Sequence, residues 1–366
     1  MGVAHLGYSP AGKPVRKYVA AKNRTEVVKK LKKIRRDFDD GLLIQDTNVT
    51  LTELFDRWFG DIMRHQIAPS TLSNYKTIAR MHILPSLGKK KLLDLSVGDV
   101  DKLLSVKIDS GLSTSTVRRI RAVLAQCLDQ AIRWGLLVRN VGTLSRSPKS
   151  VRREGRTLSP DQARHLLLTL RGHRNEALYS LMLSTGLRRG EALGLMWKDL
   201  DRETGVLRIA RQLKREGTAL VTTDTKTYRS RRAVNLPDRM LAALLEHEKR
   251  QQTEQASLGS ARSDSGFIFT SLVGTAIDPR NLYREFQTIC RLAGLESWHP
   301  HELRHSAASL MLAQGVKIQV VSQVLGHASI RMTSDVYGHL LDPDRAEAAH
   351  AMGAMLWSDD EFGKPL

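Results

Sequence analysis

Cysteine is scarce in this chain, which has only Cys127 and Cys290 among its 366 residues. Both lie among apolar residues in helical patterns, so the sequence predicts buried free thiols in a reducing compartment and excludes a disulfide framework or a cysteine-ligated metal. No run of 18 or more apolar residues occurs, and no signal peptide opens the sequence. These absences predict a soluble protein of the cytoplasm with no membrane-spanning segment.

Acidic residues are also in the minority, because 38 Asp and Glu stand against 57 Lys and Arg and leave a net charge of +19. Such an excess favours a polyanionic partner, nucleic acid before an anionic membrane. The length predicts two or three domains, since it is ample for more than one hydrophobic core.

The chain divides into four stretches with different patterns. Residues 1–47 predict a small sheet packed on a helix, and residues 48–140 predict an all-helical domain. Residues 141–157 mix Gly, Ser, Pro and Arg without apolar periodicity, which is typical of a linker. Residues 158–366 combine helical and strand-like segments, which predicts an α+β domain. The expected fold class is therefore multidomain and mainly α.

Local signals predict several element boundaries. Thr50 with Glu53 and Ser96 with Asp99 predict capping boxes at helix starts, and Ser70 is predicted to cap a helix between them. In the last domain, alternating residues predict one small antiparallel sheet with strands at 206–213, 219–223 and 232–237. Helices before and after this sheet carry the titratable residues of the domain.

These titratable residues concentrate in residues 301–337, where apolar spacing predicts three short helical segments. They are His301, Arg304, His305, His327 and Tyr337. One interpretation takes the HELRH segment as a zinc metalloprotease pattern, with two histidines as ligands and the glutamate as base. Against it, an arginine lies between the proposed ligands, where it would repel a dication, and no third ligand follows at a familiar spacing.

The other interpretation is attack on a phosphodiester. His301 and Arg304 are three residues apart and so share a helix face. Together with His327 and Tyr337 they would supply a phenol, a guanidinium and two imidazoles in a basic protein. This chemistry needs a second cation on the phosphate, and Arg188 follows a Thr-Gly break in the segment STGLRRGEALGLMW.

That segment, TKTYRSRR at 225–232, HELRH, LGH at 325–327 and Tyr337 together resemble the tyrosine recombinase or phage integrase family. The resemblance covers residues 155–345, with the segments in the family's order and approximate spacing. Within this family, the chain resembles the lambda-type integrases, which have arm-binding, core-binding and catalytic domains. The chemistry agrees, because ionising a tyrosine at pH 7 costs about 4 kcal/mol, which paired guanidinium groups on the phosphate would offset in the transition state.

The resemblance implies a role for each matched residue of the segments. Tyr337 is the expected nucleophile, which forms a 3′-phosphotyrosine and so needs neither ATP nor metal. Arg188 and Arg304 are the expected phosphate clamp. The neighbouring Arg189 is expected to face solvent or the DNA backbone.

The remaining roles are also implied by the family. Lys226 is the expected general acid for the leaving 5′-oxygen, in competition with Arg229, Arg231 and Arg232 of the same basic segment. The other expected roles are general acid/base for His301, hydrogen-bond donor to the phosphate for His327, orientation of the site for Glu191 and a structural hydrogen bond for His305.

The resemblance also assigns the domains. Residues 1–47 are expected to be an arm-type DNA-binding domain with a truncated or variant start, because the family usually has another strand before this point. Residues 48–140 are the expected core-binding domain, and residues 158–366 the catalytic domain, with a C-terminal helix at 345–356 that docks on a neighbouring subunit or packs on its own domain. The expected DNA contacts are Lys13, Arg16, Lys17, Lys22, Arg118, Arg119 and Arg121.

The implied function is site-specific recombination of duplex DNA without a cofactor, in a tetrameric assembly on two DNA sites. Whether a DNA-bending factor or a directionality factor takes part is open. Two alternatives are a type IB topoisomerase, which nicks and religates as a monomer, and a DNA-binding relative without activity.

Overall fold

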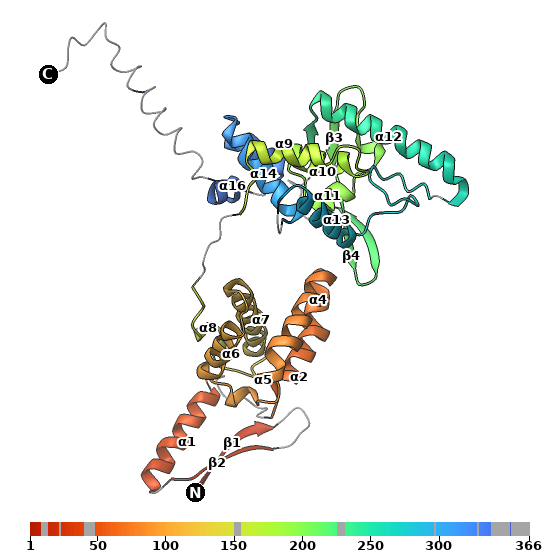
Figure 1. Cartoon of the computed structure of the whole chain (residues 1–366). Coiled ribbons are helices and arrows are strands. Elements are labelled where there is room, and N and C mark those ends of the chain that lie inside the picture. Colours follow the sequence, from red (N-terminus) through yellow and green to blue (C-terminus); the bar gives the residue numbers. More distant parts are fainter. Residues whose placement is uncertain are drawn as a thin grey trace, which may run out of the picture. The chain divides into compact units, whose positions relative to one another are not determined.

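The computed structural model describes residues 1–8, 14–21, 23–39, 48–149, 155–224, 231–261, 263–295, 298–327, 329–337 and 352 (Figure 1). The chain forms two compact units, residues 1–152 and residues 153–366. Within the described ranges, no helix is both long enough and apolar enough to cross a membrane.

The chain begins with a hairpin that packs on a helix. Strand β1 (Gly2–Tyr8) pairs antiparallel with β2 (Pro14–Val19), and α1 (Arg24–Asp39) lies beside both (Figure 1). Asn23 caps α1, because the Glu26 backbone N–H donates to Asn23 Oδ1 over 2.8 Å. This confirms the predicted small sheet and helix.

The rest of the first unit is helical, as predicted. Its elements are α2 (Leu51–Arg57), η1 (Trp58–Met63), α3 (Arg64–Gln66), α4 (Pro69–Ile78), η2 (Ala79–Ile83), α5 (Leu84–Leu87), η3 (Leu92–Asp94), α6 (Val97–Asp109), α7 (Thr114–Arg133) and α8 (Val141–Leu144). The capping boxes at Thr50 and Ser96 are confirmed. The predicted cap at Ser70 is wrong, because α4 begins one residue earlier at Pro69, whose fixed φ suits the first helical position.

The segment predicted as a linker, residues 141–157, is ordered at both ends. At its start, the Asn140 side chain caps α8 through the Gly142 backbone N–H over 2.8 Å, and Val141 is buried. At its end, Arg156 forms an ion pair with Glu302 over 3.0 Å. The described residues at both ends of the predicted linker therefore pack on the units that they join.

The second unit combines helices with short strands. Its helices are α9 (Pro160–Thr169), α10 (Glu176–Thr185), α11 (Arg189–Leu193), η4 (Trp197–Asp199), α12 (Asp238–Leu258), η6 (Gly259–Ala261), α13 (Pro279–Leu292), α14 (Pro300–Ala313), α15 (Ile318–Leu325) and α16 (Ile330–Tyr337). Its strands are β3 (Val206–Ile209), β4 (Arg211–Glu216), β5 (Ala219–Asp224) and β6 (Arg232–Asn235).

The strands form two separate antiparallel pairs. Strand β3 pairs with β6, and β4 pairs with β5. The prediction of one sheet is wrong because the first predicted strand, 206–213, is interrupted at Ala210, and its two halves take different partners. The β3–β6 pair places Arg232 at the start of β6, close to α15.

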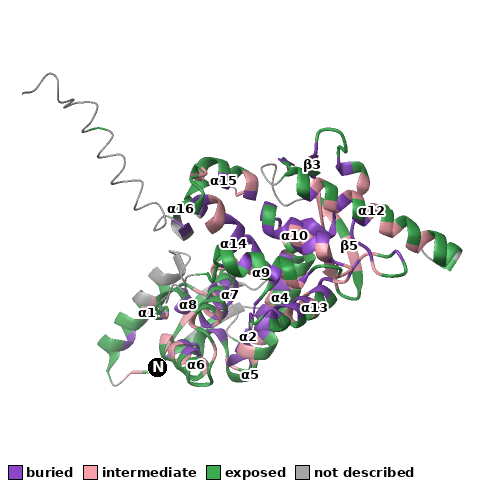
Figure 2. Cartoon of the chain, turned by 45° about the horizontal axis from the view of Figure 1, so that its top comes forward, coloured by how far each residue is buried: buried purple, intermediate pink, exposed green. Residues whose placement is uncertain are grey.

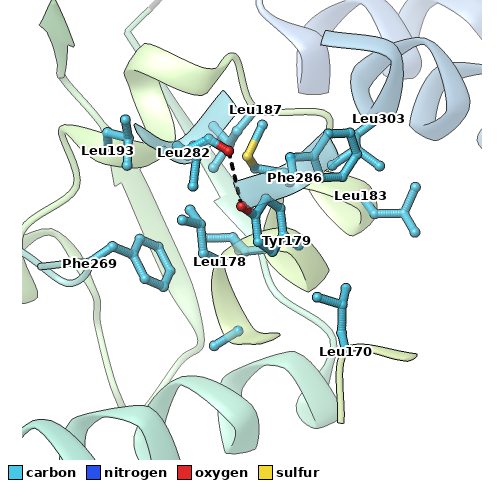
Figure 3. Packing of buried hydrophobic residues seen from close by; sticks show 14 of the residues in the cluster. Leu170, Leu178, Tyr179, Leu183, Leu187, Leu193, Phe269, Leu282, Phe286 and Leu303 are labelled. Atoms are coloured by element: carbon cyan, nitrogen blue, oxygen red, sulfur yellow. Dashed lines mark hydrogen bonds between the residues drawn. The ribbon is translucent and has the colours of Figure 1, made fainter. Parts of the chain in front are cut away.

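Helix α10 is at the centre of the core of this unit. It packs against α14 and α12, and α10 and α14 are largely buried (Figure 2). The Tyr179 ring stacks on Phe286 with ring centroids 5.2 Å apart, and its hydroxyl donates to the Leu282 carbonyl over 3.3 Å (Figure 3). This packing fixes α10, whose C-terminal end lies at the site described below.

Two further expectations concern the cysteines and the C-terminus. Cys127 and Cys290 are buried and free, as predicted. The predicted helix at 345–356 lies outside the described residues except for Met352.

Candidate active site

Arg304 is the most deeply buried cation of the site. It lies on α14 with 3% of its surface exposed, and its Nη1 donates to the Gly186 carbonyl over 2.8 Å. Its Nη2 is buried and has no hydrogen-bond partner among the described residues. Burial and the charge of Arg188 lower the pKa of Arg304 to about 9. A buried guanidinium nitrogen without an acceptor costs free energy, so an anion beside it would be favourable.

The Gly186 carbonyl is available because α10 ends in a left-handed residue. Gly186 has φ of +64°, a conformation that glycine adopts without steric cost. A Cβ at this position would lie 2.4 Å from Leu325 Cδ2. Glycine therefore satisfies two demands here, the turn that ends α10 and the close packing of α15.

Glu191 joins two arginines at the start of α11. It is 3% exposed and forms ion pairs with Arg188 over 2.8 Å and with Arg232 over 3.0 Å. Burial alone would raise the pKa of this carboxyl, but the two guanidinium groups together hold it below its ordinary value. The ionised carboxylate fixes both arginines and leaves a net positive charge.

Arg232 was assigned no role of its own from the sequence. Its side chain is 7% exposed, and its Nε donates to the Val324 carbonyl over 2.6 Å. It therefore links β6 to α15 and to Glu191. The basic segment TKTYRSRR predicted that one of its cations belongs to the site. The residue expected in that role was Lys226, which lies outside the described residues.

Tyr337 is at the end of α16 and is buried, with 4% of its surface exposed. Its hydroxyl lies 2.5 Å from His305 Nδ1, within hydrogen-bond distance. Burial raises the pKa of Tyr337 to about 12, although the charge of Arg304 acts in the opposite direction. The phenol is therefore protonated at neutral pH and needs a proton acceptor before it can act as a nucleophile.

The other two histidines lie in the same field of positive charge. His301 is exposed at the surface, and its ring contacts that of His305 edge-on, with centroids 5.1 Å apart. His327 is half-buried, with Nδ1 2.8 Å from Thr333 Oγ1. Desolvation, with the neighbouring cations, lowers the pKa of each of these two imidazoles to about 4. Both are neutral at pH 7, and each can donate one N–H.

The structure brings most of the predicted site together. The residues whose charges or hydrogen bonds meet here are Arg188, Glu191, Arg232, His301, Arg304, His305, His327 and Tyr337. Arg189 donates to the Pro279 carbonyl over 3.2 Å, and its charge also acts on His301. Among the described residues, no group of three or more His, Cys, Asp or Glu side chains could hold a metal ion.

The predicted DNA-contact residues have different surroundings. Arg118 and Arg119 are exposed, and together with Arg121 they line a hollow of about 720 Å³ on the helical domain. Arg121 donates to the carbonyls of Thr143 and Ser145, over 2.7 and 2.9 Å, so its charge is used to hold α8.

The predicted contacts of the N-terminal unit are only partly described. Arg16 is exposed on β2, and Lys17 lies on the same strand. Lys13 and Lys22 lie outside the described residues.

Comparison with known proteins decides the family. Residues 156–343, half of the chain, match the phage integrase family. This chain belongs to the phage integrase family. Residues 50–106 of this integrase match the SAM-like N-terminal domain of phage integrases, in agreement with the helical domain described above.

Relatives match this integrase over nearly its whole length. It is 31% identical to an integrase of Streptomyces ambofaciens, over 94% of this chain and 90% of the relative. It is 28% identical to a XerC-like tyrosine recombinase of Caldanaerobacter subterraneus subsp. tengcongensis, over 95% and 94% of the two chains.

Solved structures share the fold. The Tn1549 transposon integrase in complex with transposon right end DNA matches with a TM-score of 0.72 at 20% identity, over 83% of this chain and all of that chain. A lambda integrase dimer bound to a COC′ core site matches with a TM-score of 0.60 at 20% identity, over 90% of each chain.

Proposed function

We propose that this integrase is a site-specific DNA recombinase that cuts and rejoins duplex DNA through a 3′-phosphotyrosine on Tyr337, without ATP or metal. The observation that carries the proposal is the convergence of three groups of the described residues in one partly buried site. They are the Tyr337 hydroxyl, the unpartnered nitrogen of Arg304 and the Arg188 guanidinium held by Glu191. Fixed cations in a site shielded from water stabilise the charge that develops on a phosphate under attack.

In the proposed reaction, Arg304 and Arg188 bind the non-bridging oxygens of the scissile phosphate. The Tyr337 oxygen forms a bond to phosphorus while the bond from phosphorus to the 5′-oxygen breaks, and Lys226 gives that oxygen a proton. His327 donates to the phosphate, and His301 assists proton transfer. The phosphotyrosine keeps the energy of the broken bond, so attack by a 5′-hydroxyl rejoins the strand.

The proposal gives the other domains the task of holding DNA. Residues 48–140 bind the duplex. The exposed Arg118 and Arg119, which line a hollow on this domain, support this role. Residues 1–47 act as an arm-type domain through basic residues such as Arg16. A tetramer on two DNA sites is proposed because a lambda integrase tetramer bound to a Holliday junction shares this fold, with a TM-score of 0.59. The DNA acted on is that of a prokaryotic cytoplasm.

Covalent trapping tests the proposal and finds the target site at once. The protein is incubated with a randomised duplex library, and the complexes that resist SDS are isolated and sequenced. We expect one DNA sequence to be enriched with the wild type and no stable complex with Tyr337→Phe, which removes only the hydroxyl. Plasmids that carry two copies of the enriched site should then recombine, whereas relaxation without recombination would indicate a topoisomerase. A wild type that forms no stable complex would overturn the proposal.

A further inference from the structure

The proposed nucleophile has a hydrogen-bond partner that the family resemblance does not make catalytic. The Tyr337 hydroxyl lies 2.5 Å from His305 Nδ1, and this is the one hydrogen bond recorded for the hydroxyl among the described residues. His301, the expected acid/base, has its ring against that of His305 and lies at the surface. The group in position to take the phenolic proton is therefore His305.

We propose that His305 is the general base that deprotonates Tyr337 during DNA cleavage. This inference rests on the proposed function. The Tyr337 oxygen bonds to phosphorus, its proton moves to His305 Nδ1, and the bond from phosphorus to the 5′-oxygen breaks. The leaving oxygen takes a separate proton from the general acid. Rejoining reverses each transfer, so His305 returns its proton to Tyr337.

The surroundings of His305 keep it able to accept that proton. Facing groups are Arg304 and Glu302 on its own helix, the His301 ring, the Tyr337 phenol of α16 and the His327 imidazole after α15. Burial and the Arg304 charge lower the pKa of His305 below its ordinary value, against the opposing charge of Glu302. The imidazole is thus neutral at pH 7, with Nδ1 free to accept when the ring hydrogen is on Nε2.

The chain also holds the ring in place. A Cβ on Gly155 would lie 3.3 Å from both Cγ and Nδ1 of His305, so the Gly155 backbone lies against the ring. The residues that follow are fixed to α14, since the Leu158 backbone N–H donates to Ser306 Oγ over 2.9 Å. An imidazole held in this way presents Nδ1 to the tyrosine in one orientation, as a general base requires.

His305→Asn tests the proposal, because the Asn oxygen can replace Nδ1 as an acceptor but cannot hold a proton at neutral pH. On a suicide substrate that carries the trapped site, single-turnover formation of the covalent complex should slow by about 10² to 10⁴-fold. DNA affinity should be unchanged. The matched control is His165→Asn, since His165 is exposed on α9 of the same unit and lies outside the site. Cleavage by His305→Asn within a few-fold of the wild type would overturn the proposal.

A modified substrate separates the base from the acid. A 5′-bridging sulfur leaves without a proton, so it should restore cleavage by Lys226→Ala but not by His305→Asn. Restoration of His305→Asn by sulfur would overturn the base role.

The pH profile separates a base from a residue that only positions the tyrosine. The cleavage rate of the wild type should rise as pH increases through the lowered pKa of His305. The cleavage rate of His305→Asn should not show that rise. If His305→Asn cleaves slowly but its rate still rises over the same pH range, His305 only positions the tyrosine, and the proposal is overturned.

If His305→Asn does not fold, His305→Ala with added imidazole replaces it. Acceleration with imidazole concentration would support the base role, and an unchanged rate on saturating DNA would contradict it. Failure of the proposed function looks different, because the wild type itself would then form no covalent complex.

Discussion

At the scale of single residues, the site is defined by cations that lack enough acidic partners. Glu191 forms ion pairs with both Arg188 and Arg232. Within the part of the chain that the structure describes, Arg304 has a backbone carbonyl on one nitrogen and no hydrogen-bond partner on the other. This excess of donors matches the shape and charge of a phosphate, because a planar guanidinium can donate to two of its oxygens.

Arg304→Lys should therefore form the covalent complex about 10² to 10³-fold more slowly while still binding DNA, because an ammonium cannot reproduce the guanidinium geometry. Single-turnover cleavage of the suicide substrate measures the effect. Arg189→Lys is the matched control, since Arg189 donates to the Pro279 carbonyl and should cleave normally. Equal cleavage rates for the two variants would show that Arg304 is not part of the phosphate clamp.

Glu191→Gln should lower the free energy of unfolding by about 3 kcal/mol at pH 7, because it removes the anion that pairs with the buried Arg232 and the partly exposed Arg188. The pKa of Glu191 is lower in the folded state, so its stabilisation is present above its ordinary pKa of 4.5 and is lost as pH falls below that value. The difference between wild type and variant in urea unfolding should shrink with acidity. A difference independent of pH would show that the carboxylate charge is not involved.

Local spacing explains which site residues the sequence could predict. Arg188 and Glu191 are three residues apart, so their pairing follows from one helical turn. Arg232 pairs with Glu191 from 41 positions away, through a strand whose partner is β3, and no local pattern contains that contact. His305 is 32 positions from Tyr337, so the sequence could suggest a hydrogen bond for it but not the partner.

At the scale of elements, the site depends on where helices end. Helix α10 stops at Gly186, whose carbonyl pairs with Arg304 and whose missing side chain admits Leu325 of α15. A residue at this junction acts on both the fold and the site.

Gly186→Ala should lower the free energy of unfolding by about 3 kcal/mol, from a left-handed backbone and a clash with Leu325. Gly315→Ala is the control, since Gly315 also has positive φ, +75°, but has open space around its Cα. It should cost only about 1 kcal/mol, the conformational part. Equal losses in urea titrations would contradict the packing role of Gly186.

Element prediction succeeded where short-range signals decide the structure. The predicted capping boxes at Thr50 and Ser96 are present. The short helix α8 within the predicted linker was missed. Its stability comes from the Asn140 cap and from packing on α7, and amino-acid composition does not reveal either interaction.

At the scale of the whole molecule, the net charge of +19 governs the encounter with DNA. Six to ten phosphate contacts would lower the affinity by about 10³ to 10⁵ between 50 and 200 mM salt. Arg118→Ala should reduce the slope of log affinity against log salt by about 1, whereas Arg121→Ala should change it little, since its guanidinium is bonded to α8. A titration with no salt dependence would contradict DNA binding through phosphates.

The central claim is that Tyr337 bonds to a DNA phosphate inside the arginine cluster. Mass spectrometry of the trapped complex, after digestion with nuclease and protease, tests it most directly. The account predicts a peptide whose added nucleotide is linked through phosphate to Tyr337. A nucleotide linked to any other residue would contradict it.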